Sequence, residues 1–176
     1  MGLKNNTITS PGDCVSVDQL ESPTPGFIGQ VKGLLTRKCY QVTTVFVDHY
    51  RDVSYVHHQL STSGDDTIAA KNAFKTFASS NGVLIRHYHA DNGCFAEHKF
   101  LNAVQQKGQT ISFCGIVAHF QNGIAKKPIR DLQDSARTML IHASHCWPSA
   151  ITVNLWPYAL SLAADIHNVT SNHPDG

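Results

Sequence analysis

Alternating apolar and polar residues predict strands in the first third of the chain. Residues 13–21 (DCVSVDQLE) alternate loosely, as in a strand. Residues 40–50 and 53–60 are rich in β-branched and aromatic side chains and are separated by a short polar bend, which predicts an antiparallel pair. The segment SPTPGF (22–27) is predicted to form a turn, because proline and glycine favour turns.

Helical spacing of apolar residues dominates the rest of the chain. A first helix is expected after the N-cap cluster STSGDD (61–66), and Asn81-Gly82 should end it. Pro157 is expected to kink the last helix. The later patterns predict strands over 83–91 and 110–118, a short helix in AEHKFLNAVQQKG, and helices over 124–144 and 149–169.

The predicted order of elements is β-β-β-α-β-α-β-α-α. This order indicates an α/β fold in which a mixed five-stranded sheet is flanked by helices on both faces. A chain of 176 residues is long enough for one well-buried core and too short for two ordinary domains. We therefore expect one core domain over 13–170, between a loose N-terminal segment, 1–12, and a C-terminal tail, 171–176.

The composition is that of a globular protein, with 41% apolar and 15% charged residues. The formal net charge of +1 provides no general attraction to nucleic acid, so any DNA contact has to be local. The N-terminal residues lack the apolar segment of a signal peptide, and prolines interrupt the longest uncharged run, 147–164. We expect an intracellular protein with no membrane partner and with five cysteines as free thiols.

Three positions fall where this topology would bring strand ends together. Asp18 lies in the middle of the first strand, Asp91 closes the fourth strand, and position 126 opens the long helix. In such sheets, chemistry gathers at strand ends near a switch in strand order. Carboxylates there could hold two Mg²⁺ ions about 3.5–4 Å apart and promote an in-line phosphoryl displacement. The alternative is that each aspartate only stabilises a turn or a cap, which is common for an Asp-Asn-Gly sequence.

A family resemblance rests on several segments in a fixed order: VSVDQLESPTPGF, TTVFVDHYRDVSYV, HYHADNGCFAEHKF, FCGIVAHFQNGIA, IRDLQDSARTML and WPSAITVNLWPYALSLAADIHN. Over about residues 13–170 the chain resembles the integrase core of Copia-type LTR retrotransposons, part of the retroviral integrase superfamily. The resemblance implies an RNase H-like fold. It also implies Mg²⁺-dependent processing of DNA ends and strand transfer, in which water or a DNA 3′-hydroxyl attacks a phosphodiester.

The resemblance further implies a catalytic Asp-Asp-Glu triad. Asp18 matches the first member and Asp91 the second, and both would be ligands of two Mg²⁺ ions, with Mn²⁺ as a substitute. The third member normally follows the Asn-Gly-x-Ala of this loop, and that position holds Lys126. Asp48 competes with Asp18 as the first aspartate, but we interpret its FVDHY motif as structural. Glu97 is an alternative third carboxylate that matches the family position poorly.

Lysine at position 126 removes an oxygen ligand and adds a cation beside the proposed metal ions, so we expect weak or absent activity in this copy. Candidate DNA-binding residues share one side of the long helix: Lys126, Lys127, Arg130 and Arg137. In the resembling family this helix borders the DNA, which favours phosphate contacts. The alternative is a solvated face whose basic residues pair with Asp131 and Asp134.

Two functions remain open from the sequence. The first is an integrase core, impaired in this copy, and the second is a non-catalytic remnant that binds DNA or pairs with another integrase chain. A different nuclease on the same fold is disfavoured by the length of the resemblance. The expected partners are double-stranded DNA and further copies of the chain, with no small-molecule cofactor, and the expected location is nuclear if the protein functions.

The eleven histidines do not favour a zinc site, because no paired Cys-x-x-Cys accompanies them. In the resembling family a zinc-binding module normally precedes this core, and its pattern of histidines and cysteines is missing from the sequence. We therefore expect this chain to be a fragment of a longer polyprotein.

Overall fold

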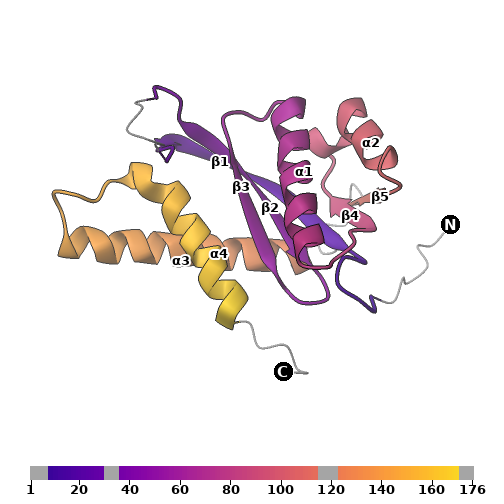
Figure 1. The fold of residues 1–176 in the computed structure, drawn as a ribbon. Helices are drawn as coiled ribbons and strands as arrows, with labels where there is room; N and C mark the ends of the chain where they lie inside the picture. The colour runs from indigo at the N-terminus through magenta and orange to yellow at the C-terminus, as the bar shows by residue number, and fades with distance from the viewer. Residues whose placement is uncertain (1–7, 30–35, 115–122, 171–176) are drawn as a thin grey trace.

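A computed structural model describes residues 8–29, 36–114 and 123–170 of the chain (Figure 1). The elements in chain order are β1 Val15–Gly26, β2 Tyr40–Asp48, β3 Ser54–Gln59, α1 Gly64–Ser80, β4 His87–Ala90, η1 Cys94–Ala96, α2 His98–Gln105, β5 Thr110–Phe113, α3 Gly123–Cys146, η2 Val153–Leu155 and α4 Trp156–Thr170. Within the described residues, no helix combines the length and the apolar character needed to cross a bilayer.

The five strands form one mixed sheet in the order β3-β2-β1-β4-β5. β1 and β2 are antiparallel, as are β2 and β3, whereas β4 lies parallel to β1 and β5 parallel to β4. A parallel neighbour requires a crossover connection, and α1 supplies it between β3 and β4, while α2 supplies it between β4 and β5. The predicted α/β fold with a mixed five-stranded sheet is confirmed.

Helices cover both faces of the sheet, with α1 and α2 on one side and α3 and α4 on the other (Figure 1). The alternation of β2 explains how one strand serves both cores. Phe46 packs toward α1, where it stacks on Phe74 with ring centroids 4.5 Å apart. Val45 and Val47 point the other way, into the core formed by α3 and α4.

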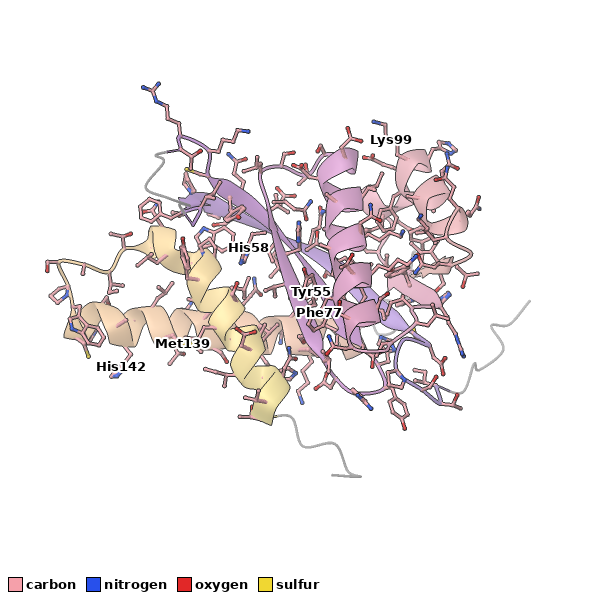
Figure 2. All side chains as sticks on the ribbon, viewed as in Figure 1. Tyr55, His58, Phe77, Lys99, Met139 and His142 are labelled. Atoms are coloured by element: carbon pink, nitrogen blue, oxygen red, sulfur yellow. The ribbon has the colours of Figure 1, made fainter. Side chains whose placement is uncertain are left out.

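Aromatic and sulfur-containing side chains extend both cores toward their edges. On the α1 side, Tyr55 of β3 lies against Phe77 of α1, with ring centroids 4.9 Å apart (Figure 2). On the other side, Met139 of α3 packs against the buried cluster that α3 and α4 share (Figure 2). α1 begins as expected, because the Ser63 side chain accepts a hydrogen bond from the Asp66 backbone N–H.

The prediction of a turn at 22–27 was wrong, because β1 continues to Gly26. Its register against β2 shifts between Glu21 and Gly26, and prolines in sheets occur at such irregularities. Trp156 Nε1 donates a hydrogen bond to the Thr24 carbonyl at 2.9 Å. Gly26 has Pro157 and Trp156 so close that a Cβ there would collide with both. Packing against the start of α4 therefore keeps the proline-rich segment extended.

The last helix was also predicted incorrectly at its start. α4 begins at Trp156, after the short helix η2, and not at residue 149. Pro157 is the second residue of α4, within its first turn, where its missing N–H leaves no hydrogen bond unmade. The expected kink is therefore absent. β4 is shorter than predicted, and the part of the predicted strand 110–118 after residue 114 lies outside the described residues.

Candidate active site

Asp18 and Asp91 lie side by side because their strands are parallel neighbours. Val17 of β1 is paired with Ala90 of β4, and the next residue on each strand is an aspartate. Both aspartates line a cleft of about 370 Å³. The other residues of the cleft are Gln19, Glu21, Thr62, Gly93, Cys94, Phe95 and Glu97. The structure thus brings together two predicted site residues that are far apart in the sequence.

Side-chain alternation along β1 directs Asp18 toward the α3 side of the sheet. Val17 belongs to the core under α1 and α2, so the residue that follows it points to the opposite face. Leu20, two residues beyond Asp18, packs against the core under α3 and α4. Asp18 therefore points to the face of the sheet that α3 and α4 cover.

Asp18 is half-buried, and its Oδ1 accepts a hydrogen bond from the Gln19 backbone N–H at 2.8 Å. Burial raises the pKa of the Asp18 carboxyl, the Gln19 hydrogen bond lowers it, the charge of Asp91 raises it and the charge of Lys126 lowers it. The net result is a raised pKa. Asp18 therefore lies within electrostatic reach of both other predicted site positions.

Asp91 is exposed and is held by its own turn. Its Oδ1 accepts a hydrogen bond from the Gly93 backbone N–H at 3.1 Å, which is a typical Asx turn. A Cβ on Gly93 would lie only 3.1 Å from the same oxygen, so glycine allows this close approach. One oxygen of the carboxylate thus stabilises the turn after β4, which is the alternative role that the Asp-Asn-Gly sequence left open.

Lys126 is exposed and lies in the first two turns of α3. Its charge acts on Asp18 and also on the Cys114 thiol, just past β5. It forms no ion pair within 4 Å of a carboxylate in the described residues. Position 126 thus lies in the first turn of α3 and carries a cation.

The side chains of the cleft do not fit a pair of divalent metal ions. Asp18 and Asp91 offer the oxygen ligands that Mg²⁺ prefers, whereas Lys126, which is not among the residues that line the cleft, offers none. In the part of the chain that the structure describes, no group of three or more His, Cys, Asp or Glu residues is placed to hold a metal. Glu97 also lines the cleft. Its Oε2 lies close to Gly64, the first residue of α1, and would be 3.0 Å from a Cβ atom placed on that glycine.

Asp48, the competing first aspartate, lies outside the cleft. It is buried, its Oδ1 accepts a hydrogen bond from the Gly12 N–H at 2.7 Å, and its Oδ2 accepts one from the Arg51 N–H at 2.9 Å. Both oxygens are therefore engaged by backbone groups, which agrees with a structural role.

Comparison with known proteins identifies the fold. No protein-family model and no curated protein matches the chain. The catalytic core domain of BIV integrase matches with a TM-score of 0.61 and 19% identity over 94% of this chain and 89% of its own. The HTLV-2 integrase catalytic core domain, solved in complex with magnesium, matches with a TM-score of 0.61 and 15% identity over 94% and 92%. This chain has the fold of a retroviral integrase catalytic core.

A larger integrase assembly matches over part of its length. The simian T-cell lymphotropic virus intasome, solved with the PP2A regulatory subunit B56 gamma, matches with a TM-score of 0.60 and 16% identity. The match covers 85% of this chain and 47% of that chain. At these identities the likeness establishes the integrase core fold, and neither the Copia-type assignment nor the roles of individual residues follow from it.

The basic residues on α3 of this integrase fold are free to meet a ligand. Lys126, Lys127, Arg130 and Arg137 are all exposed. Within the described residues, none of them forms an ion pair with Asp131 or Asp134. The structure therefore does not support the alternative that these basic residues pair with acidic residues of the same helix.

Sequence reasoning missed two features near the cleft. Glu21 lines it three residues beyond Asp18 on β1, and its place on the same strand was the only signal. The β4 and β5 strands also carry a hydrogen-bonded row in which Ser112 Oγ lies 2.8 Å from His87 Nε2 and 2.9 Å from His89 Nδ1. Burial lowers the pKa of both histidines. The row gives both histidines of the HYH sequence hydrogen-bond partners within the sheet.

Proposed function

We propose that this chain derives from a retrotransposon integrase core of the Copia type, and that its ancestral reaction is Mg²⁺-dependent DNA end processing and strand transfer. The observation that carries the proposal is the meeting of Asp18 and Asp91 in one cleft at the ends of parallel strands. The integrase core fold supports it, as does the magnesium complex of the HTLV-2 core. If the protein functions, we expect it in the nucleus, on double-stranded DNA.

We further propose that the reaction is impaired because Lys126 takes the place of the third carboxylate. Replacing glutamate by lysine changes the local charge by two units. Two unit charges about 4 Å apart interact by roughly 4 kcal/mol at an effective dielectric of about 20, and a divalent cation would be affected more. A loss of about 4 kcal/mol in transition-state stabilisation slows a reaction on the order of a thousandfold.

The residues of this chain would still bind DNA through α3. Four cations that form no ion pair with any described residue follow one side of the helix: Lys126, Lys127, Arg130 and Arg137. Lys126 and Arg130 are one helical turn apart, and Arg137 lies two turns further on, so the row is about 16 Å long. Such a row suits successive phosphates of one strand, and contacts of this kind bind without reading sequence.

The test uses one oligonucleotide duplex that carries the terminal sequence of a retrotransposon DNA, with Mg²⁺ or Mn²⁺ present. We expect Lys126→Glu to process the end on the order of a thousandfold faster than the unmodified chain, because it restores an oxygen ligand and removes a cation. Asp91→Asn in the Lys126→Glu background should abolish the gain. Equal activity of the unmodified chain and Lys126→Glu would contradict the proposed impairment.

Binding is measured with the same duplex before chemistry. We expect the affinity to fall steeply between about 50 and 200 mM salt, and Lys127→Ala to reduce the slope of log affinity against log salt by about 0.9. Lys99→Ala, which changes an exposed lysine on α2, is the matched control and should leave the slope unchanged. An affinity that does not respond to salt would reject DNA as the partner.

The second candidate is a non-catalytic remnant that binds DNA or pairs with a second integrase chain. The observation in its favour is an apolar stripe on the solvent side of α4. Its members lie at helical spacing: Tyr158, Leu162, Ile166 and Val169. The HTLV-2 core is known in dimeric and trimeric forms, which supports a second copy of the chain as the partner.

A further inference from the structure

The two aspartates of the cleft lie just beyond the point where their strands stop pairing. The parallel ladder between β1 and β4 ends at Val17 and Ala90, and the next residues are Asp18 and Asp91. The chain after β4 then turns into η1, whose Phe95 is buried in the core under α1 and α2. Because the backbone ladder does not reach the two carboxylates, their relative position depends on contacts that side chains make beyond it.

Gln19 makes such a contact, because it joins the strand that carries Asp18 to the turn that carries Asp91. Its backbone N–H donates a hydrogen bond to Asp18 Oδ1 at 2.8 Å, and its side-chain Oε1 accepts one from Cys94 Sγ at 3.1 Å. Cys94 directly follows Gly93, whose N–H donates to Asp91 Oδ1 at 3.1 Å. One side-chain hydrogen bond thus completes a short path between the two carboxylates.

Two threonine hydroxyls fix the orientation of the Gln19 amide. Its Nε2 donates to Thr44 Oγ1 on β2 at 3.2 Å and to Thr67 Oγ1 on α1 at 3.1 Å. The single hydrogen of each hydroxyl is already used. Thr44 donates to the Gln59 side chain, and Thr67 donates to the backbone carbonyl of the α1 N-cap residue. Both hydroxyls can therefore only accept from Gln19, and its Oε1 has to face the thiol.

We propose that Gln19 is a positioning residue of the candidate active site, and that its amide holds the Asp91 turn in place relative to Asp18. The amide connects four segments of the chain, β1, β2, α1 and η1. In this role Gln19 acts through the two aspartates and not on the DNA. The inference deepens the proposed function, on which it rests, because a fixed arrangement of the aspartates affects catalysis only if the reaction takes place there.

The first test is hydrogen exchange of the whole chain, measured by mass spectrometry without DNA or metal ions. We expect Gln19→Leu to accelerate exchange in residues 91–96 on the order of tenfold, because the turn loses its link to β1 and two hydroxyls lose their donor. Residues 129–140 of α3, on the other side of the sheet, should exchange as in the unmodified chain. Equal acceleration in both segments would show a general loss of stability and would overturn the proposal.

Cys94 allows a second variant that leaves the glutamine in place. Cys94→Ala removes the donor and should accelerate exchange in 91–96 roughly twofold to fivefold. Cys94→Ser keeps a donor there and should retain most of the protection. If the alanine and serine variants exchange alike, the hydrogen bond to Gln19 does not hold the turn.

Gln109→Leu is the matched control for the glutamine substitution. Gln109 is also buried, and its Nε2 donates a hydrogen bond to the Ile85 carbonyl at 3.1 Å. It is not among the residues that line the cleft, so its replacement should leave exchange in 91–96 unchanged. The same acceleration in Gln109→Leu and Gln19→Leu would reject a specific role of Gln19.

The second test measures DNA end processing in the Lys126→Glu background. We expect Gln19→Leu to lower kcat by up to about a hundredfold and to leave KM for the duplex nearly unchanged, because a displaced Asp91 affects the reacting geometry more than DNA binding through α3. Full kcat together with faster exchange in 91–96 would refute the positioning role. An inactive Lys126→Glu chain would refute the proposed function, while the exchange data would still decide whether Gln19 holds the turn.

Discussion

Lys71 is a lysine inside the core between α1 and α2. It is 0% exposed, and its Nζ donates a hydrogen bond to the Ala103 carbonyl in the last turn of α2 at 3.0 Å. The negative end of the α2 dipole suits an ammonium group there. Burial, together with the nearby charges of Lys75 and Lys107, lowers the pKa of Lys71 to about 8. In the described structure, no carboxylate pairs with it.

The buried ammonium makes the stability of the protein depend on pH. Because the folded pKa of Lys71, about 8, lies below the ordinary lysine value of 10.5, the unfolded state binds more protons between these values, and stability rises with pH across that window. Below pH 8 the penalty is fully present. We expect Lys71→Met to be more stable than the unmodified chain at pH 7 by on the order of 3 kcal/mol.

The measurement is urea unfolding of both chains between pH 7 and pH 10.5. The difference in free energy of unfolding should shrink as the pH rises above 8, because the unmodified lysine is then neutral in the folded state. Lys75→Met, on the same helix, serves as the control and should show a smaller change. A difference that stays constant with pH would show that Lys71 is not the responsible group.

At the scale of elements, α4 has two apolar faces. One packs into the core through Ala159, Leu160, Ala163 and Ala164. The other is the exposed stripe, in which Leu162 is 51% and Val169 83% accessible to solvent. An amphipathic helix normally has one apolar face, and a second, exposed one is a candidate interaction surface. We expect a second copy of this chain to cover it.

Leu162→Glu tests this expectation. A charge in the middle of the stripe should convert an oligomer to a monomer in analytical ultracentrifugation, because an uncompensated buried charge is strongly unfavourable. Since Leu162 is exposed in the single chain, the Tm of the monomer should change little. Thr138→Glu adds the same charge on the exposed side of α3 and should not affect assembly. A monomeric unmodified chain would rule out self-association through α4.

At the scale of the molecule, two cores share one sheet. Phe100 of α2 is fully buried on one side of it, and Trp156 packs on the other. β2 contributes side chains to both cores, Phe46 to the first and Val45 to the second. Loss of packing under α2 should therefore weaken the side that α3 and α4 cover, although the two helix pairs lie on opposite faces.

Phe100→Ala measures this coupling. We expect it to lower the free energy of unfolding by about 3–5 kcal/mol, the usual range for a buried phenylalanine. Tryptophan fluorescence, which reports on the α3–α4 side, and circular dichroism should give the same shifted midpoint. If the fluorescence midpoint stays where it is in the unmodified chain while the circular dichroism moves, the two sides unfold separately and the shared-sheet argument is wrong.

The amino-acid sequence by itself determined the order and type of the elements. Periodicity and capping sequences are local properties. The N-cap cluster at 61–66 therefore predicted α1, and the β-branched runs predicted β2 and β3. The same reasoning placed Asp18 on a strand and Asp91 at a strand end, and it isolated Lys126 at the start of a helix. Each of these statements depends on residues that are close together in the chain.

The tertiary structure decided which of these residues meet. The register of β1 against β4 places Asp18 beside Asp91, while the backbone N–H of the distant Gly12 donates a hydrogen bond to Asp48. Contact with the start of α4 kept β1 extended where prolines predicted a turn, and the fold brought Glu21 into the cleft. Pairing between strands and packing between helices join residues far apart in sequence, so no local pattern contains them.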